Sequence, residues 1–359
     1  MPAVANADQR KAQAVERAFP PPREGALDTN GKPGTVNREP RTANPPTDAD
    51  HATLSRLTAF LRAHTGVADK LAIAQAYAPA QALAGAIRLG DDCAAIPDNH
   101  GFLLFAGEGM LESFVADDPW FAGYSAVMVN LSDIAAMGGR SLAIVDILWT
   151  PGLGQGGEIW EGITAASQSY GVPVVGGHTT ITRTGHSVLA AAVLGRANRL
   201  ITSFDARPGD ALLMAVDLRG EYRRDKPFWN ASVGAPAERL RSDLELLATL
   251  AEKGWVRAGK DISNGGVVGT LAMLLQCSQR GAELWLDQIP RPDHVDLTRW
   301  LVSFPSFGFL LSVDPSQTDN VKKLFNDREI AAAQVGTITE PGAFVLVYGT
   351  ARETFPVMV

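Results

Sequence analysis

The sequence predicts an α+β protein made of two layered sheet-and-helix domains. A length of 359 residues suggests two domains of roughly 150 residues each. The chain is 46% hydrophobic and 20% charged, which is typical of a globular protein that buries a full core. In both halves, short apolar runs alternate with segments of helical periodicity, and this alternation favours sheets covered by helices.

The first 50 residues differ from everything that follows. They are rich in Pro, Asn, Arg and Gly and contain few large aliphatic side chains, so residues 1–50 are expected to form a disordered tail. The first helix is expected to begin near Ala52 and to end at Gly66. Its apolar residues at helical spacing are Leu54, Leu57, Phe60 and Leu61.

The first domain is expected to span residues 51–200. Its predicted strands are 101–107, 141–149, 172–177 and 187–195, and its predicted helices are 120–139 and 156–171. The stretch 196–210 contains a Pro-Gly-Asp turn signal and is the best boundary between the domains.

The second domain is expected to span residues 205–350. Its predicted strands are 211–218, 282–286, 307–313, 333–338 and 343–348, and its predicted helices are 237–254, 296–303 and 316–326. Between 255 and 281 a strand runs through a glycine pair into a helix. Neither half contains GxGxxG or GxxxxGK[ST] after a strand, so Rossmann and P-loop folds have no support.

Charge and composition narrow the function classes. The net charge of −7 gives no electrostatic reason to expect binding to nucleic acid or to an anionic membrane. Cys93 and Cys277 are too few for a disulfide framework. No run of 18 apolar residues and no signal-peptide pattern is present, so a cytoplasmic protein that acts on a small molecule is expected.

The acidic stretch Gly90-Asp91-Asp92 precedes the apolar run of the first predicted strand. Taken locally, it is an ordinary turn, because Gly and Asp are preferred there. Glu108 and Glu112 follow that strand, and a carboxylate cluster forms if the strand lies beside the Asp91–Asp92 loop. Mg²⁺ typically takes one or two protein carboxylates plus phosphate oxygens and waters. Solvent-exposed acids are the alternative for both glutamates.

The segment NLSDIAAMGG places Asn130 and Asp133 on one face of a predicted helix, because they are three residues apart. The neighbouring side chains are apolar, and a carboxylate buried among them needs a partner. The alternative is an aspartate at the rim of the core.

Two further segments combine glycines with polar side chains. In VVGGHTT, Gly176 and Gly177 allow a ligand to approach the backbone, and His178, Thr179 and Thr180 offer hydrogen-bond donors. A lone histidine, however, more often has no such role.

In DISNGG, Asp261 ends a predicted strand, and Gly265-Gly266 open a helix whose free N–H groups suit a phosphate. Alternatively, Asp261 or Asn264 simply caps that helix.

Taken in order, GDD, ExxxE, NLSDIAAMGG, GGHTT and DISNGG resemble the superfamily of aminoimidazole-ribonucleotide (AIR) synthetase, selenophosphate synthetase, thiamine-monophosphate kinase and the hydrogenase-maturation dehydratase. The resemblance covers residues 66–350. It implies a two-domain PurM-like fold, with an N-terminal α/β domain whose mixed sheet pairs with a second subunit in a homodimer and a C-terminal α+β sandwich. It also implies ATP between the domains, with its phosphates held by Mg²⁺ on acidic loops.

The resemblance assigns roles by position. The implied metal ligands are Asp91, Asp92, Glu108, Asp133 and Asp261. The implied catalytic residues are His178 and Asp261, and the implied ATP-binding residues are Asn130, Gly176, Gly177, Thr179, Asn264, Gly265 and Gly266. The implied chemistry is phosphoryl transfer to a small acceptor, or ATP activation of an amide-like oxygen that a nitrogen then displaces.

Departures from the family pattern leave the substrate open. Thiamine-monophosphate kinases carry an acid where this chain has His178, and selenophosphate synthetases carry a reactive cysteine that is missing before Gly90. The chain is most similar to the AIR synthase-related proteins, whose family name settles no substrate. A non-catalytic nucleotide-binding or scaffold protein is therefore the alternative, because His178 and Asn264 replace acids.

Two basic features are candidates for substrate contacts. The loop 221–230 clusters Arg223, Arg224 and Lys226 with aromatic residues and is a candidate for acceptor contacts. Lys70 is a candidate for contacting a phosphate. For both, a solvated surface charge is the alternative.

Overall fold

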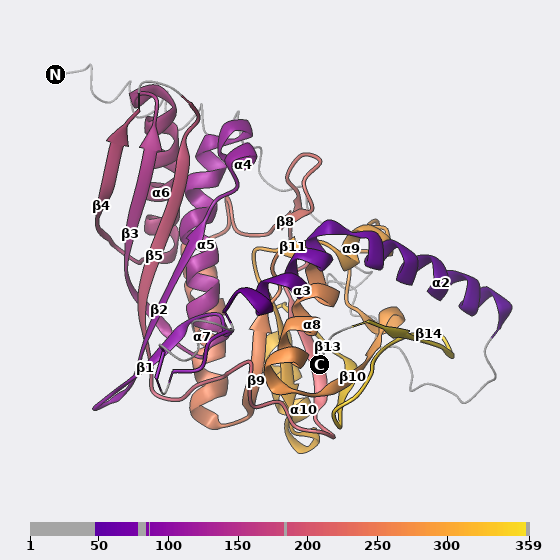
Figure 1. The fold of residues 1–359 in the computed structure, drawn as a ribbon. Helices are drawn as coiled ribbons and strands as arrows, with labels where there is room; N and C mark the ends of the chain where they lie inside the picture. Colours follow the sequence, from indigo (N-terminus) through magenta and orange to yellow (C-terminus); the bar gives the residue numbers. More distant parts are fainter. Residues whose placement is uncertain (1–46, 78–83, 86, 183–184, 357–359) are drawn as a thin grey trace.

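The computed structural model describes residues 47–77, 84–85, 87–182 and 185–356, and Figure 1 shows their arrangement. Of the disordered tail expected at residues 1–50, residues 1–46 lie outside the described residues, whereas residues 48–50 form the first turn of a helix, so the tail was predicted too long. Within them the chain forms two sheet-and-helix domains, one containing a five-stranded sheet and the other a seven-stranded sheet.

The N-terminal domain consists of one sheet with helices packed on one face. Its strands are β1 (Ala94–Asp98), β2 (Gly101–Gly109), β3 (Arg140–Thr150), β4 (Val174–Ile181) and β5 (Val188–Ala197), and its helices are α4 (Glu112–Asp117), α5 (Pro119–Ala136) and α6 (Leu153–Tyr170). The strand order is β1-β2-β5-β3-β4, with β3 parallel to β4 and antiparallel pairs elsewhere. This is the mixed sheet that the sequence predicted.

Helix α5 carries Asn130 and Asp133 of the NLSDIAAMGG segment and packs against α6 and β5. Its N-terminus is fixed by Asp118, whose side chain accepts a hydrogen bond from the Phe121 N–H, and by Pro119 at the first helical position. Gly162 of α6 lies against α5, since a Cβ there would come within 1.8 Å of the Trp120 carbonyl oxygen. The close approach of the two helices leaves α5 buried along almost its whole length.

The other face of the five-stranded sheet is apolar and exposed. Along each strand, alternate residues point toward α5 and α6, and the intervening residues point away from the helices. We call this face the outer face. Its large apolar side chains, each at least 36% exposed, include Ile96, Phe105, Val145, Ile147, Trp149, Val188 and Leu194.

The C-terminal domain is built on a sheet with strand order β15-β14-β10-β13-β6-β12-β9. The strands are β6 (Ala211–Val216), β9 (Val256–Asp261), β10 (Gly281–Trp285), β12 (Gly308–Val313), β13 (Ala331–Thr339), β14 (Phe344–Tyr348) and β15 (Ala351–Phe355). The helices are α7 (Ala237–Lys253), α8 (Gly266–Ser278), α9 (Leu297–Leu301) and α10 (Thr318–Asn326). A small third sheet joins β7 (Glu221–Tyr222), β8 (Phe228–Asn230) and β11 (Phe304–Pro305).

Strand β6 contains only apolar residues, because side chains on both faces of the sheet are buried. Leu212 and Met214 belong to the core on the α8 side, whereas Leu213 and Ala215 belong to the core that contains residues of α7 and α10. Both faces of the sheet are therefore covered, and every residue of β6 is buried.

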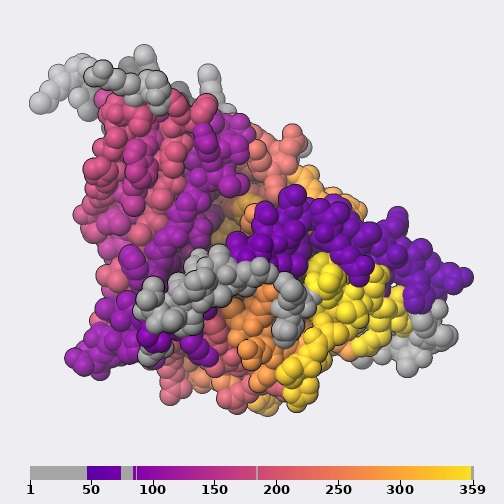
Figure 2. Space-filling view, viewed as in Figure 1, coloured from indigo at the N-terminus to yellow at the C-terminus, as the bar shows by residue number. Residues whose placement is uncertain are grey.

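The N-terminal helices α2 (Asp48–Ala63) and α3 (Thr65–Tyr77) pack on the C-terminal domain, although the sequence assigned this segment to the first domain. Leu54, Leu57 and Leu61 of α2 enter the same core as α8 and β6. Figure 2 shows α2, in indigo, lying over the yellow C-terminal strands.

The expected end of the first helix at Gly66 differs in the structure. Gly66 lies inside α3 and does not end a helix. Because it has no side chain, α3 approaches Asn264 and Gly265 closely. The other expected strands and helices are present with boundary shifts of a few residues. Elements that the sequence did not predict are α3, α4, β1, β7, β8, β11 and β15.

Candidate active site between the two domains

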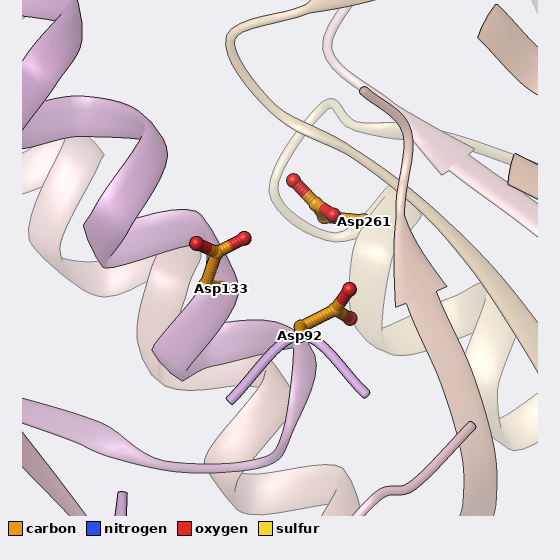
Figure 3. Close-up of side chains that lie close together, drawn as sticks. All are labelled: Asp92, Asp133 and Asp261. Atoms are coloured by element: carbon orange, nitrogen blue, oxygen red, sulfur yellow. The ribbon is translucent and has the colours of Figure 1, made fainter. Parts of the chain in front are cut away.

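Three aspartates from distant parts of the chain meet where the two domains touch. Asp92 lies in the loop before β1, Asp133 lies on α5, and Asp261 is the last residue of β9. One carboxylate oxygen from each lies within 4.8 Å of the other two. Figure 3 shows the three side chains pointing toward one another. We call this group the aspartate cluster.

Local structure fixes each member of the cluster. The loop of Asp92 turns at Gly90, whose φ of 109° favours glycine. The Gly90 carbonyl oxygen accepts a hydrogen bond from Cys277 Sγ on α8. Strand β9 is the edge strand of the C-terminal sheet and contacts α5, so its last residue faces the α5 helix. Asp133 and Asp261 are only 7% and 8% exposed.

The carboxylates of the cluster destabilise one another's charges. Burial, and next the charge of Asp92, raises the pKa of Asp261 to about 7. Burial, with added repulsion from Asp261 and Glu108, raises the pKa of Asp133 well above its usual range. Such a group of acids is stable in its ionised form when a cation lies between the oxygens.

Two lysines reduce this repulsion. Lys260 of β9 is 3% exposed, forms an ion pair with Asp92 Oδ1, and donates to Ser203 Oγ at 3.4 Å. Lys70 of α3 donates to Ser263 Oγ at 2.9 Å, and its charge lowers the pKa of Asp261 and of Glu108.

The second oxygen of Asp92 provides a test of whether the site fits a metal ion. Asp92 Oδ2 is buried and has no hydrogen-bond partner among the described residues. A buried carboxylate oxygen left unpaired is costly, and a divalent cation would satisfy it together with Asp133 and Asp261. Three converging carboxylates are hard oxygen ligands of the kind that Mg²⁺ takes, so the residues present fit this ion.

Asp91, which the resemblance implied as a metal ligand, is hydrogen-bonded to Ser203 in the structure. Its carboxylate accepts hydrogen bonds from the Ser203 N–H at 2.9 Å and from Ser203 Oγ at 2.7 Å. Adjacent Asp91 and Asp92 thus bind different partners, and Asp91 anchors the loop to the segment that connects the domains. Burial, and next Asp92, raises the pKa of Asp91 to about 6.

Glu108 reaches toward the cluster from the N-terminal sheet. It lies near the end of β2 on the same side of the strand as Leu104 and Ala106, which face the helices. The residue is exposed, yet desolvation by the surrounding protein atoms raises its pKa, while the charge of Lys70 lowers it. Glu108 therefore lies at the solvent-facing side of the cluster.

The GGHTT segment lies apart from the cluster. Gly176, Gly177, His178 and Thr179 belong to the edge strand β4, which is separated from β2 by β5 and β3. His178 pairs with Ile147 and so points to the outer face, where its Nε2 lies 3.1 Å from Thr180 Oγ1. Within one chain the structure does not bring His178 to Asp133 or Asp261.

Close packing against Asp146 accounts for the glycine at position 177. A Cβ at this position would come within 2.0 Å of Asp146 Oδ1, so the glycine makes room for the buried Asp146 carboxylate of β3. Neither Asp146 oxygen has a hydrogen-bond partner among the described residues. The periodicity of the sequence did not identify Asp146 as a site residue, because a single acid in an apolar strand is not a clear sign of function.

Asn130 is fully buried one turn from Asp133. Its Nδ2 donates to the Ala126 carbonyl oxygen at 2.7 Å and to the Ala191 carbonyl oxygen of β5 at 3.4 Å. The side chain thus joins α5 to the sheet, and this placement does not expose it to a nucleotide.

The glycine pair that opens α8 is covered in the structure. Gly265 and Gly266 have φ values of 87° and 62°, and both are buried. A Cβ at Gly265 would come within 2.7 Å of the Gly66 carbonyl oxygen, so α3 lies directly over this helix start. Asn264 is exposed beside it.

The basic loop 221–230 is paired with acids of the N-terminal domain. Arg223 forms an ion pair with Asp118 at 2.8 Å and stacks over Phe121, and Lys226 pairs with Asp117 at 2.9 Å. These contacts connect the two domains, and Arg224, whose side chain is 62% exposed, donates to the Asp117 carbonyl oxygen at 2.9 Å.

Sequence reasoning missed Lys260 and Ser203. The signal for Lys260 was its place beside Asp261 in a strand that otherwise reads as buried, where a lysine requires a charged partner. Ser203 gave no signal, because its role depends on a contact with Asp91, 112 residues away.

The fold and the site together define a two-domain protein of the PurM-like class, with an aspartate cluster between the domains. Two family models match the chain: the AIR synthase related protein N-terminal domain over residues 90–197 and its C-terminal domain over residues 211–349. The chain therefore belongs to the AIR synthase related family of the PurM-like superfamily.

Individual relatives agree with this assignment. The uncharacterized protein sll0787 of Synechocystis sp. is 48% identical over 75% of this chain and 84% of its own length. The thiamine-monophosphate kinase of Synechococcus elongatus is 27% identical over 75% of this chain and 88% of its own. The structure of Thermotoga maritima PurL complexed with ATP shares the fold, with a TM-score of 0.64, 22% identity and coverage of 74% of this chain and 45% of that one.

None of the helices that the structure describes is both long enough and apolar enough to cross a membrane.

Proposed function

We propose that this protein is a Mg²⁺-ATP-dependent enzyme that phosphorylates a small molecule or activates it with ATP. The aspartate cluster carries the proposal, because it brings three carboxylates together and leaves Asp92 Oδ2 buried and unpaired. Similarity to a thiamine-monophosphate kinase and to a PurL structure complexed with ATP supports the same class of reaction.

In this proposal Asp92, Asp133 and Asp261 hold the divalent ion, and Glu108 is a fourth candidate ligand from β2. When bound, the ion supplies positive charge to phosphate oxygens, which is the main requirement of phosphoryl transfer. Lys70 adds a second positive charge from α3 on the side of Ser263. The reaction then depends on positioning and charge, and no protein nucleophile is needed.

Asp91 and Ser203 act as positioning residues in this arrangement. Their two hydrogen bonds hold the loop so that Asp92 points at Asp133 and Asp261. These hydrogen bonds join a loop of the N-terminal domain to the connecting segment. They therefore also fix the position of the two halves of the site relative to each other.

We also propose that the outer face of the five-stranded sheet binds a second copy of this chain. Phe105, Ile147 and Trp149 lie on that face, and an exposed apolar patch of this kind usually marks an interface. A homodimer would bury it. In such a dimer His178 would lie at the interface, because it shares that face with Ile147.

A non-catalytic nucleotide-binding protein of the same fold is the second candidate. The observations that favour it are the distance of His178 from the cluster and the burial of the α8 start beneath α3.

Isothermal titration with ATP and ADP, in the presence and absence of Mg²⁺, tests the common part of both candidates. Mg²⁺-dependent binding is expected, and its absence would refute both. A screen of small metabolites for ADP release then separates them, because turnover requires the enzyme and binding without any turnover supports the second candidate.

A further inference from the structure

Lys260 is an uncommon neighbour for a metal-binding cluster. It lies immediately before Asp261 in β9, it is almost completely buried, and its ammonium group forms an ion pair with one oxygen of Asp92. The side chain of Asp92 is only 5% exposed, so water does not screen this pair effectively. The chain thus holds a permanent positive charge within the aspartate cluster.

The two oxygens of Asp92 have different environments. Oδ1 is engaged by Lys260, whereas Oδ2 is buried without a hydrogen-bond partner in the described part of the chain. The neighbouring Asp91 is held by Ser203 through both of its oxygens. Of the acidic loop, Oδ2 of Asp92 is therefore the oxygen that remains for a metal ion.

We propose that Lys260 is a resident cation that limits the cluster to a single divalent ion, held by Asp92 Oδ2, Asp133 and Asp261. This inference rests on the proposed function, since it requires that the cluster binds a divalent ion. A second ion beside Asp91 and Asp92 would have to take Oδ1 from Lys260 and approach its ammonium group closely. Like charges at such short range in a buried site repel strongly.

Lys260 also lowers the negative charge that is available to a second ion. Asp91, Asp92, Asp133 and Asp261 carry one formal negative charge each when ionised, and Lys260 offsets one of the four. One divalent ion leaves the group with a net charge of −1, whereas two would leave it at +1 before any phosphate arrives. Removing Lys260 would restore both the oxygen and the negative charge that a second ion needs.

The test counts Mn²⁺ ions bound to the purified full-length protein by equilibrium dialysis, with electron paramagnetic resonance to measure free Mn²⁺. The wild type is expected to bind one ion per chain. The Lys260→Met variant, which keeps the length of the side chain and removes its charge, is expected to bind two. The control Lys323→Met removes a lysine that is 72% exposed on α10 and pairs with Asp327, and it is expected to bind one.

Each other outcome has a definite meaning. Two ions in the wild type, or one ion in both the wild type and Lys260→Met, would overturn the role of Lys260 while leaving the metal site intact. No bound Mn²⁺ in any variant would overturn the metal site of the proposed function itself. If Lys260→Met does not fold, as judged by circular dichroism, Lys260→Gln retains hydrogen-bonding ability without the charge and gives the same count.

Discussion

Lys260 of β9 and Asp92 of the loop before β1 form a buried ion pair that joins the C-terminal domain to the N-terminal domain. The two residues are 168 positions apart in the sequence. Their contact means that the candidate site exists only when both domains are correctly docked.

The first prediction concerns Asp133. Replacing it by asparagine removes one of three charged ligands, and we expect affinity for Mn²⁺ to fall at least about tenfold. In the absence of metal the melting temperature should stay the same or rise, because Asp133→Asn relieves repulsion from Asp261. Mn²⁺ titration and thermal melts measure both effects. The control Asp319→Asn, whose side chain is 95% exposed on α10, should change neither, and equal losses in both variants would contradict the assignment.

The second prediction concerns pH. The pKa of Asp261 is raised to about 7 in the folded protein, above the value of about 4 expected for an unfolded aspartate. The folded state then binds more protons than the unfolded state between those values, so this group favours folding at low pH and loses that contribution as pH rises through 7. Stability of the metal-free protein should therefore fall from pH 5 to pH 8.

Divalent ions should reverse this trend, because they bind the ionised carboxylates. Mg²⁺ is expected to raise the melting temperature more at pH 8 than at pH 5.5. Asp261→Asn should flatten the pH dependence of the metal-free protein. A Mg²⁺ effect that is the same at both pH values would count against the cluster as the binding site.

The third prediction concerns the outer face. Light scattering is expected to give twice the chain mass of 38.2 kDa for the wild type. Ile147→Asp places a charge at the centre of the outer face and should yield monomers, with little loss of stability because Ile147 is already 36% exposed in the single chain. Leu153→Asp introduces the same charge at an 82% exposed position at the start of α6 and should remain a dimer. A monomeric wild type would refute the proposed interface.

The fourth prediction compares two adjacent glycines. A Cβ at Gly177 would come within 2.0 Å of Asp146 Oδ1, whereas a Cβ at Gly176 would meet no described atom within 4 Å. Gly177→Ala should therefore lower the free energy of unfolding by about 1–3 kcal/mol, the usual cost of overpacking. Gly176→Ala should leave it nearly unchanged. Denaturant unfolding distinguishes the two, and equal effects would show that Asp146 does not confine position 177.

The sequence allowed much of the fold to be predicted, because periodicity reports burial directly. The alternation of strand β3 and the helical stripe of α2 were both visible in the residues. Strand β15 and the short strands β7, β8 and β11 were missed, because their pairing depends on partners far along the chain. Gly66 was misread as a helix end, since its actual role is to let α3 approach Gly265.

The candidate site could likewise be predicted from the sequence only in part. The order of the acidic motifs led to Asp92, Asp133 and Asp261, whose carboxylates the structure brings together. The sequence could not distinguish Asp91 from Asp92, because that difference depends on Ser203 and Lys260 across the domain boundary. Nor could it place His178 on the outer face, because strand order is not encoded in any single segment.

The packing of α2 against β14 and β15 has a topological consequence. Arg62 near the end of α2 donates to the Thr354 carbonyl oxygen at 2.8 Å, so the two ends of the described chain are tied together within one domain. The five-stranded domain is thus an insertion within a unit that both ends of the described chain complete. That unit can close its core only after the whole insert has been synthesised, and no single cut of the chain separates the two domains.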